Sequence, residues 1–157
     1  MQTIMNICLW MDNQAEEAAR FYTGIFKDAE ILDTQYYGDE GFDVHGQAKG
    51  QVLTVSFRLN DMKFVALNGG PKFKFNEAIS IVLNCETDEE VDYYWEALTS
   101  EGGRESMCGW LIDRYGVSWQ VIPNELQTLL SIPEKRSIVT EAFLKMKKLD
   151  MRILRQL

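Results

Sequence analysis

An internal repeat constrains the fold of this chain more than any other feature of its sequence. One order of elements, a strand, a capped helix and three further strands, is predicted twice along the 157 residues. When the two predicted helices are superposed, Glu16-Glu17 falls near Glu89-Glu90, and Phe21-Tyr22 falls near Tyr94-Trp95. A repeated order of five elements indicates an internal duplication, which must be recognised before any single motif is weighed.

The first module is expected over about residues 1–68. Residues 13–16 have the form of a capping box, which predicts a helix over 14–26. The segment 38–50 holds four glycines and several charges, which favours a mobile loop over a packed element. The predicted strands of this module are 4–11, 30–37, 52–59 and 63–67, the last two joined by a turn at Asn60-Asp61.

The second module is expected over about residues 77–123, after a boundary at the Asn-Gly-Gly-Pro segment 68–71. A second capping box at 87–90 begins a helix that ends at Gly102-Gly103. The apolar stripe of this helix consists of Val91, Tyr94, Trp95 and Leu98. The predicted strands are 78–85, a short one near 105–107, and the two arms of a hairpin over 108–123 that turns at Gly116.

A helical tail is expected over 124–157, with helices at 124–130 and from Pro133 onward. The second of these has an apolar stripe of Ile138, Ala142, Met146 and Leu149. The basic residues near the end either face water or attract an acidic partner; they are Lys145, Lys147, Lys148, Arg152 and Arg155. Together the two modules and the tail predict a single domain over 1–157.

The formal net charge of −8 argues against nucleic acid as a partner, since phosphates favour a basic surface. The chain has no signal-peptide pattern and no apolar run of membrane-spanning length, so we expect no membrane contact. Its three cysteines, Cys8, Cys85 and Cys108, are widely spaced and form no Cys-x-x-Cys motif. We therefore expect reduced, mostly buried thiols in a cytoplasmic protein.

The local motifs of the two modules resemble one known family. They are WMDNQAEEA at 10–18, FY at 21–22, NGGP at 68–71, FKFNEAIS at 73–80, DYYW at 92–95, CGWL at 108–111 and GVSWQ at 116–120. In this order they resemble the PhnB-like branch of the vicinal oxygen chelate superfamily, which includes glyoxalase, bleomycin-resistance protein and extradiol dioxygenase. The resemblance implies an α+β fold of paired βαβββ modules, each curling a sheet around a cavity, with C-terminal helices and assembly as a homodimer.

The resemblance also implies a divalent metal, held by His and Glu ligands on the first, fourth, fifth and eighth strands. The predicted first strand offers only Cys8, and the fourth offers no donor. The fifth offers Ser80, Asn84 and Cys85, and on the eighth Gln120 stands where metal-binding members carry glutamate. Neutral amides and hydroxyls are poor ligands beside a carboxylate, so we expect neither a metal nor another cofactor.

Five residues are candidates for contact with a small-molecule ligand: Gln120, Ser118, Ser80, Asn84 and Trp110. The four polar ones lie on predicted strands whose opposite faces are apolar, and binding pockets combine apolar walls with a few placed polar groups. Alternatively, these groups bond to one another or to buried water. Trp110 could stack on a flat ligand, whereas Trp119 is expected in the core beneath the second helix.

We therefore expect a metal-independent small-molecule binding protein, in the manner of the bleomycin-resistance members. One alternative is a superfamily enzyme (a lyase, a dioxygenase or the nominal 3-demethylubiquinone-9 3-methyltransferase) with an unusual metal site that uses Cys8, Cys85 or the loop around His45. Another is a metal-free enzyme that acts through His45, Asp113 or a bound cofactor. A third is a vestigial cavity, with a surface such as the basic tail meeting a partner. The chain contains no G-x-G turn of a nucleotide-type cofactor site, so we interpret the methyltransferase label of the branch as inherited.

Lone reactive groups are expected to be structural. His45, the single histidine, could be a general base on a lid, but in a glycine-rich loop it is expected at the solvated surface. Cys108 has no histidine near it in sequence and is expected as a buried, inert thiol.

Overall fold

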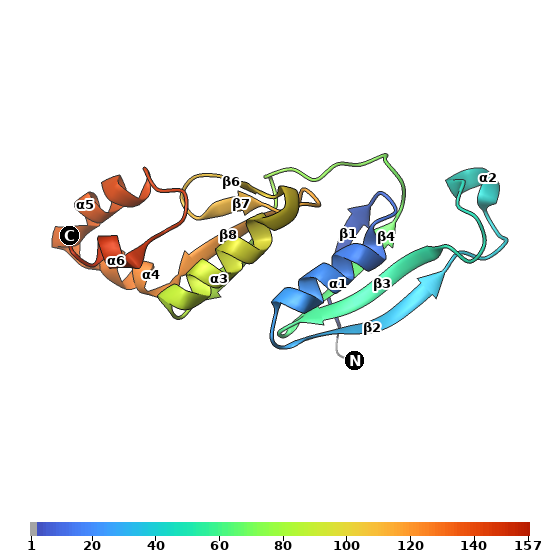
Figure 1. Ribbon diagram of the computed structural model, residues 1–157, viewed down its shortest axis with the longest axis horizontal. Coiled ribbons are helices and arrows are strands. Elements are labelled where there is room, and N and C mark those ends of the chain that lie inside the picture. The colour runs from blue at the N-terminus through green and yellow to red at the C-terminus, as the bar shows by residue number, and fades with distance from the viewer. Residues whose placement is uncertain (1–2) are drawn as a thin grey trace. The chain divides into compact units, whose positions relative to one another are not determined.

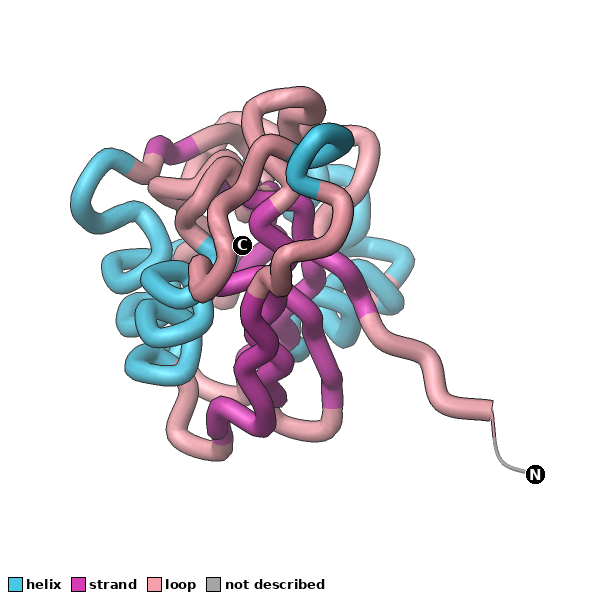
Figure 2. The backbone as a smooth tube through the Cα atoms, turned by 90° about the vertical axis from the view of Figure 1, so that its right-hand side faces the viewer, coloured by secondary structure: helices cyan, strands magenta, loops and turns pink. Residues whose placement is uncertain are grey.

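Each half of the chain forms a mixed four-stranded sheet with a helix against one face. The structure is a computed structural model that describes residues 3–157, and the chain divides into two compact units, Met1–Lys74 and Phe75–Leu157 (Figure 1). Residues 3–6 run away from the strands as a segment without regular structure (Figure 2). The first unit contains β1 (Ile7–Met11), α1 (Ala15–Ile25), β2 (Ala29–Tyr36), α2 (Phe42–His45), β3 (Val52–Leu59) and β4 (Met62–Asn68).

The second unit repeats this order and adds the helical tail. Its elements are β5 (Ile81–Cys85), α3 (Asp88–Thr99), a 3-10 turn η1 (Ser100–Gly102), β6 (Arg104–Glu105), β7 (Trp110–Ile112), β8 (Ser118–Pro123), α4 (Asn124–Ser131), α5 (Pro133–Phe143) and α6 (Met151–Leu154). Within residues 3–157, no helix combines the length and the apolar character needed to cross a membrane.

The two sheets have the same topology. Sheet 1 has the strand order β1-β4-β3-β2, and sheet 2 has the order β5-β8-β7-β6. In each, the first and last strands of the module lie side by side in parallel, and the other neighbours are antiparallel. The predicted α+β class and the repeated βαβββ order are confirmed, while the predicted single domain with its module limits stays a prediction.

Aromatic rings join α1 to sheet 1. Tyr22 stacks on Phe57 with ring centroids 5.9 Å apart, and Phe57 stacks on Phe64 at 5.2 Å. All three side chains are buried, and α1 adds the small residues Ala15, Ala18 and Ala19 to the same interface. Because small residues let the helix approach the sheet closely, the aromatic rings fill the space between them.

The start of α1 shows that the capping box predicted at 13–16 is wrong. Asn13 has a left-handed backbone with φ of 62°, and it does not cap the helix. The cap comes from Asn68 at the end of β4, whose Oδ1 accepts a hydrogen bond from the Ala15 N–H at 2.8 Å. A side chain distant in sequence thus satisfies one of the N–H groups that every helix leaves unpaired at its start.

The start of α3 confirms the second predicted capping box. Thr87 accepts a hydrogen bond from the Glu90 N–H at 3.2 Å, and the Glu90 carboxylate accepts from the Glu86 N–H at 2.8 Å. The helix then buries Val91, Trp95 and Leu98. All groups of this cap lie within five consecutive residues, 86–90, so the local sequence was enough to predict it.

The segment 68–71 wraps around an indole of sheet 1. Trp10 Nε1 donates to the Gly70 carbonyl oxygen at 2.8 Å, and the Phe73 ring packs edge-on against Trp10 with centroids 4.8 Å apart. A Cβ atom on Gly69 would lie 2.2 Å from the indole ring. Glycine is therefore required at this position by the close approach of backbone to ring.

The segment 38–50 is more ordered than the predicted mobile loop. It contains α2, and both ring nitrogens of His45 bond inside the segment: Nδ1 accepts from the Gln47 N–H at 3.0 Å, and Nε2 lies 3.0 Å from the Glu40 carbonyl oxygen. With Nδ1 as the acceptor, the ring proton is assigned to Nε2. The ring also packs on Tyr37 with centroids 4.5 Å apart.

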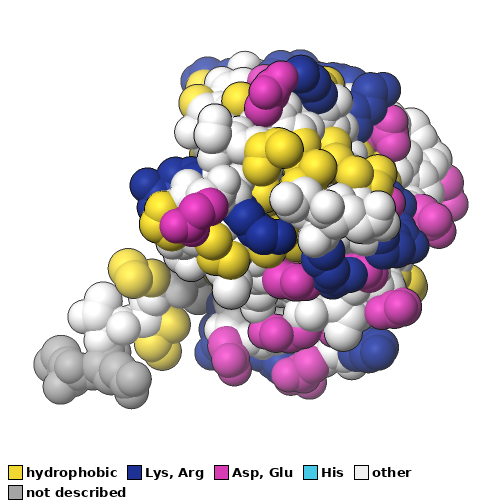
Figure 3. Space-filling view, turned by 90° about the vertical axis from the view of Figure 1, so that its left-hand side faces the viewer, with side chains coloured by type: hydrophobic (Ala, Val, Ile, Leu, Met, Phe, Trp, Pro, Cys, Tyr) yellow, Lys and Arg dark blue, Asp and Glu magenta, His cyan; other side chains and the backbone are white. Residues whose placement is uncertain are grey.

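The tail is not the long second helix that its apolar pattern predicted. α5 ends at Phe143, because the carbonyl oxygens of Met146 and Lys147 accept hydrogen bonds from the N–H groups of Cys108 and Gly109, both at 2.7 Å. Ile138 is 47 % exposed. Figure 3 faces the tail end of the chain, where hydrophobic side chains gather on the surface among charged ones. The tail instead forms a small core of Leu126, Leu129, Val139, Leu149, Met151 and Leu154.

Most of the basic residues of the tail meet acidic partners within their own unit. Lys145, which lies just after α5, pairs with Glu141 of that helix at 2.8 Å, whereas the others pair with residues of α3, α4 and β6 and with Asp150 at the start of α6. These pairs are Lys147–Glu105, Lys148–Asp92, Arg152–Asp92, Arg152–Asp150, Arg155–Asp88 and Arg155–Glu125. Four of the five basic residues near the end of the chain, Lys147, Lys148, Arg152 and Arg155, thus pair with α3 or β6 rather than only facing water.

Candidate functional site

A buried carboxylate holds the hairpin of β7 and β8. Asp113 is 3 % exposed, and its Oδ1 accepts from the N–H groups of Tyr115 and Val117 at 2.9 and 3.1 Å. Its Oδ2 accepts from the Trp119 Nε1–H at 2.8 Å. The local backbone bonding expected of an aspartate in a turn is confirmed, and it fixes the register of β7 on β8.

Hydrogen bonding identifies the face of sheet 2 that α3 covers. Trp95 of α3 donates its Nε1–H to Glu105 at 2.9 Å, so Glu105 lies on the covered face. Glu105 is opposite Leu111, and Leu111 is opposite Trp119. Directly opposed residues share a face, so Trp119 lies beneath α3, as predicted, and it is 1 % exposed. Alternation along β8 then turns Gln120 away from α3.

All five predicted ligand-binding residues lie on the opposite side, which we call the far face of sheet 2. Register places Gln120 beside Val82 and Trp110, and it places Ser118 beside Ile112. The predicted members are Ser80, Asn84, Trp110, Ser118 and Gln120, and the apolar side chains between them are Val82, Ile112 and Ile122. The structure therefore brings together residues that are up to 40 positions apart, as Ser80 and Gln120 are.

Two of the polar residues bond directly to each other. Gln120 Nε2 donates to Ser80 Oγ at 2.9 Å, which assigns the amide nitrogen to the Ser80 side. Within residues 3–157, no donor forms a hydrogen bond with Gln120 Oε1, so this oxygen is left as an acceptor. This bond agrees with the alternative prediction that the polar groups bond to one another. It uses the amide nitrogen of Gln120 but not the amide oxygen.

Ser118 differs from the other buried polar residues that the structure describes, because its side chain forms no hydrogen bond. Its side chain is 2 % exposed, and Oγ is the one buried side-chain oxygen or nitrogen in residues 3–157 without a hydrogen-bond partner. A buried hydroxyl without a partner costs about 1–3 kcal/mol, and almost all such groups are satisfied by protein, water or a ligand.

The far face has an exposed end and an end closed by the tail. Asn84 is exposed and Trp110 is half-buried. Ile122 packs against the small core of the tail, so the tail closes the face at the end of β8. The sequence pattern placed Ile122 on this face, but nothing in it showed that the tail would cover this residue.

The residues of the far faces do not fit a divalent metal. On β1, β4, β5 and β8, which the structure describes in full, the side chains turned away from the helices include one thiol, Cys8, and no imidazole or carboxylate. Across residues 3–157, no group of three or more His, Cys, Asp or Glu side chains is placed to hold an ion. We therefore derive no chemistry through a metal.

The remaining reactive side chains have structural surroundings. Both nitrogens of His45 are used within its own loop, which leaves neither as a base in the resting structure. Cys85 is buried as predicted, and burial raises the pKa of its thiol to about 12. Cys8 is exposed and Cys108 is only half-buried, so the prediction of mostly buried thiols is wrong for both.

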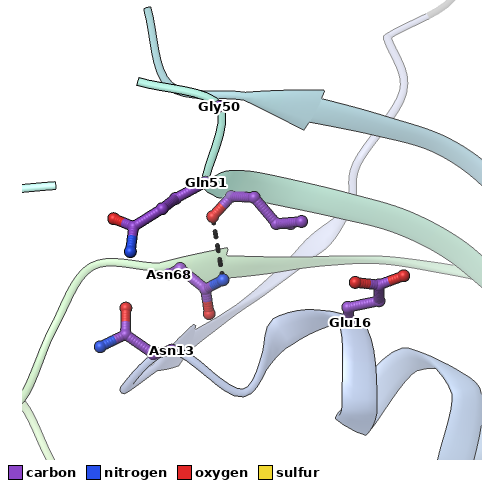
Figure 4. Close-up of a pocket in the computed structure, with 6 residues that line it drawn as sticks. Asn13, Glu16, Gly50, Gln51 and Asn68 are labelled. Carbon is purple, nitrogen blue, oxygen red and sulfur yellow. Dashed lines mark hydrogen bonds between the residues drawn. The ribbon is translucent and has the colours of Figure 1, made fainter. Parts of the chain in front are cut away.

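A separate pocket of about 350 Å³ lies in the first unit, at the start of α1 (Figure 4). Its lining includes Asn13, Glu16, Gln51 and Asn68, and Figure 4 shows the Asn68 amide between β4 and the start of β3. Asn68 Nδ2 donates to the Val52 carbonyl oxygen at 2.9 Å, while its Oδ1 caps α1. Both ends of this amide are used to join elements, so the pocket is built around a structural residue.

Comparison with known proteins places the chain in a family. A family model described as 3-demethylubiquinone-9 3-methyltransferase matches residues 3–122, which span both sheets. The chain belongs to this family. This 3-demethylubiquinone-9 3-methyltransferase family is the PhnB-like branch of the vicinal oxygen chelate superfamily, as the motifs of the two modules predicted.

Solved structures support the same assignment. A PhnB protein from Bacillus cereus, described with the same methyltransferase name, is 32 % identical to this family member, with a TM-score of 0.67, and the match covers 77 % of this chain and 99 % of that one. A protein from Pseudomonas aeruginosa shares the fold at 20 % identity and a TM-score of 0.62, covering 78 % and 98 %. The fosfomycin resistance protein FosX from Mesorhizobium loti shares it at 16 % identity and 0.57, covering 83 % and 98 %. The search of curated protein sequences gives no match.

Proposed function

We propose that this family member is a metal-independent protein that binds a small molecule on the far face of sheet 2. The observation that carries the proposal is the gathering of Ser80, Ser118, Gln120 and Trp110 on one face with apolar neighbours. Apolar surface with a few fixed polar groups is the usual composition of a small-molecule site. Binding of this kind needs neither a metal ligand set nor a general base.

The enzyme alternatives find less support in the same side chains. Asp113 is committed to the hairpin through three hydrogen bonds, and His45 is committed to its loop. A general base must reach the proton that it removes, and its lone pair must be accessible in the working geometry. The alternative metal site would use Cys8 and Cys85. Cys8 lies on the face of sheet 1 that α1 leaves uncovered, whereas Cys85 is buried beneath α3, so the two thiols do not lie on equivalent faces of the two sheets.

We further propose that the protein works as a homodimer. β5 is an edge strand, and Ile79 and Val82 at this edge are 69 % and 50 % exposed. Apolar side chains along an unpaired strand favour association, and a second copy of the chain would bury them. The three free cysteines fit a reducing compartment, which supports the cytoplasm as its location.

Native mass spectrometry of the protein purified without chelator tests metal independence, small-molecule binding and dimer formation. We expect a metal-free dimer that retains a small organic mass. A stoichiometric divalent metal would contradict metal independence, and a monomer at micromolar concentration would contradict the dimer.

Gln120→Ala tests the position of the site. We expect the variant to fold with a nearly unchanged thermal midpoint, because Gln120 is only half-buried, and to lose affinity for the retained molecule. Ser56→Ala, a matched change on a half-buried strand position of sheet 1, should leave binding unchanged. Equal affinity of Gln120→Ala and the unchanged protein would show that the ligand sits elsewhere.

A further inference from the structure

The dipeptide Asn68-Gly69 at the end of β4 is held by contacts that require both of its residues. Asn68 Oδ1 accepts from the Ala15 N–H at 2.8 Å, and its Nδ2 donates to the Val52 carbonyl oxygen at 2.9 Å. Gly69 lies so close to Trp10 that a Cβ atom there would be 2.2 Å from the indole ring. Neither side chain can therefore be replaced without loss of these contacts.

The same dipeptide is chemically labile when the chain is unfolded. Asparagine is a thermolabile residue, because its side-chain amide can be attacked by the backbone nitrogen of the next residue. Glycine has no Cβ atom, so it hinders this attack less than any other residue at the next position. The chain contains seven asparagines, and Asn68 is the one that a glycine follows. We expect the unfolded chain to lose an amide there first.

The reaction needs only the dipeptide and water. The Gly69 backbone nitrogen loses its proton and attacks the Asn68 Cγ atom, so that a new C–N bond closes a cyclic imide. The Cγ–Nδ2 bond breaks, and its nitrogen leaves as ammonia with the proton that the backbone nitrogen gave up. Water then opens the imide to aspartate or isoaspartate, and the net change is a water gained and an ammonia lost.

The fold holds each reacting group in a hydrogen bond. The Gly69 N–H donates to the Met11 carbonyl oxygen at 3.0 Å, and both ends of the Asn68 amide are bonded as described above. Asn68 is 6 % exposed, and its own carbonyl oxygen accepts from the Tyr37 O–H at 2.6 Å. Attack therefore requires β4 to separate locally from β1, from α1 and from the start of β3.

We propose that Asn68-Gly69 is a deamidation site that the fold keeps closed and that local opening of the first unit around β4 makes reactive. The product opposes reclosing. An aspartate can still accept from the Ala15 N–H, but it has no N–H to donate to the Val52 carbonyl oxygen, and it adds a negative charge to the pocket that Glu16 lines. Isoaspartate lengthens the backbone by the side-chain methylene. The frequency of this opening thus limits how long the protein stays intact.

Peptide mapping by mass spectrometry, on samples incubated folded and in urea, tests the site and its protection. In urea we expect Asn68 to deamidate before the other asparagines. In the folded protein we expect its deamidation to be at least about a hundredfold slower, because the reactive state is then a minor population. Earlier reaction of another asparagine in urea, or similar rates at Asn68 in both samples, would overturn the proposal.

Tyr37→Phe tests whether opening at β4 controls the reaction. The variant keeps Asn68-Gly69 but loses the O–H that bonds to the Asn68 carbonyl oxygen. We expect deamidation about threefold to tenfold faster, the change that the loss of one hydrogen bond gives to the open population. Tyr36→Phe is the matched control: Tyr36 is 59 % exposed, so its hydroxyl should not matter. Equal rates in Tyr37→Phe and the unchanged protein would contradict control by this opening.

Low urea concentrations give the same information if Tyr37→Phe does not fold. In the unchanged protein, deamidation at Asn68 and hydrogen exchange of the Ala15 amide should then accelerate in proportion, because both need the same opening. Faster exchange without faster deamidation would show that the site stays closed in that opening.

The deamidated protein tests the effect of the product. We expect it to lose hydrogen-exchange protection in α1 while α3 keeps its protection, because the Asn68 amide joins elements of the first unit. Unchanged protection of α1 would show that the amide is not needed for closure. These measurements involve no ligand, so their outcome is independent of the proposed binding function.

Discussion

At the scale of single residues, the Asp113 carboxylate supports more structure than a turn residue usually does. It accepts hydrogen bonds from two backbone N–H groups and from the indole of Trp119, which is 1 % exposed. We expect Asp113→Ala to lower the free energy of unfolding by about 3–5 kcal/mol, because two buried donors and one partly buried donor lose their acceptor. Urea denaturation followed by tryptophan fluorescence measures this change.

Asp113→Asn is the control for the hairpin. The amide oxygen can still accept from Tyr115 and Val117, but an NH2 group then faces the Trp119 Nε1–H. We expect a loss of about 1–2 kcal/mol, smaller than that of the alanine variant. A loss below 1 kcal/mol for Asp113→Ala would show that the carboxylate does not hold the hairpin.

Cys85 should be chemically silent in the folded protein. Burial, with a smaller contribution from the charge of Glu90, raises the pKa of its thiol to about 12, so about one molecule in 10⁵ carries the thiolate at pH 7. We expect a variant with Cys8→Ser and Cys108→Ser to react with Ellman's reagent only when unfolded. Rapid labelling of that variant under native conditions would contradict the burial of Cys85.

At the scale of elements, the tail is joined to β6 and α3 by ion pairs that depend on pH. The Trp95 indole N–H and Lys147 lower the pKa of Glu105, and Arg152 lowers the pKa of Asp150. A carboxyl group whose pKa is lower in the folded state stabilises that state above its ordinary pKa, and the stabilisation is lost as the pH falls through the lowered value. The ordinary pKa is 4.5 for Glu105, whose pair joins the tail to β6, and 3.8 for Asp150, whose pair lies within the tail, so attachment of the tail should weaken below about pH 4.5.

Hydrogen exchange as a function of pH measures this attachment. We expect the amides of α6 to lose protection between about pH 4.5 and pH 2, before those of β8 do. Lys147→Met should shift the loss to higher pH, whereas Lys145→Met, which removes a pair with Glu141 of α5, should not. Simultaneous loss of protection in α6 and β8 would show that the ion pairs do not hold the tail separately.

The order of the elements could be predicted because it depends on local patterns. The strand alternation of 117–121 and the capping box of α3 lie within short segments, and the structure confirms both. The cap of α1 could not be predicted, since Asn68 lies 53 residues away from the Ala15 N–H that it satisfies. The end of α5 was missed for the same reason, because its following carbonyl groups bond to Cys108 and Gly109.

In the candidate site, too, local sequence patterns predicted some features, while others depend on the tertiary structure. Alternation along β8 placed Ser118 and Gln120 on one face, and register adds Trp110 and Ser80 to it. Alternation carries no information about burial, however, so the pattern did not distinguish the buried Ser118 from the half-buried Gln120. Burial depends on what else packs against the face, and that is set by the tertiary structure.

At the scale of the whole molecule, the two halves share a topology but differ in the residue that caps the N-terminus of their helix. In the second half, Thr87 caps α3 across three residues. In the first half, Asn68 caps α1 across 53 residues and comes from the last strand of the sheet. The duplication has thus kept the arrangement of elements while one copy uses a local contact and the other a distant one.

This difference assigns the two halves different places in the order of folding. A helix with a local cap can form before its sheet, whereas α1 gains its cap only when β4 has joined, at the entropic cost of closing a long loop. In pulse-labelling hydrogen exchange during refolding, we expect the amides of α3 to be protected before those of α1. Thr87→Ala should delay protection of α3, and Asn68→Ala should leave that early phase unchanged; earlier protection of α1 would contradict this order. In that order, the later of two copies of one topology is the first to begin folding.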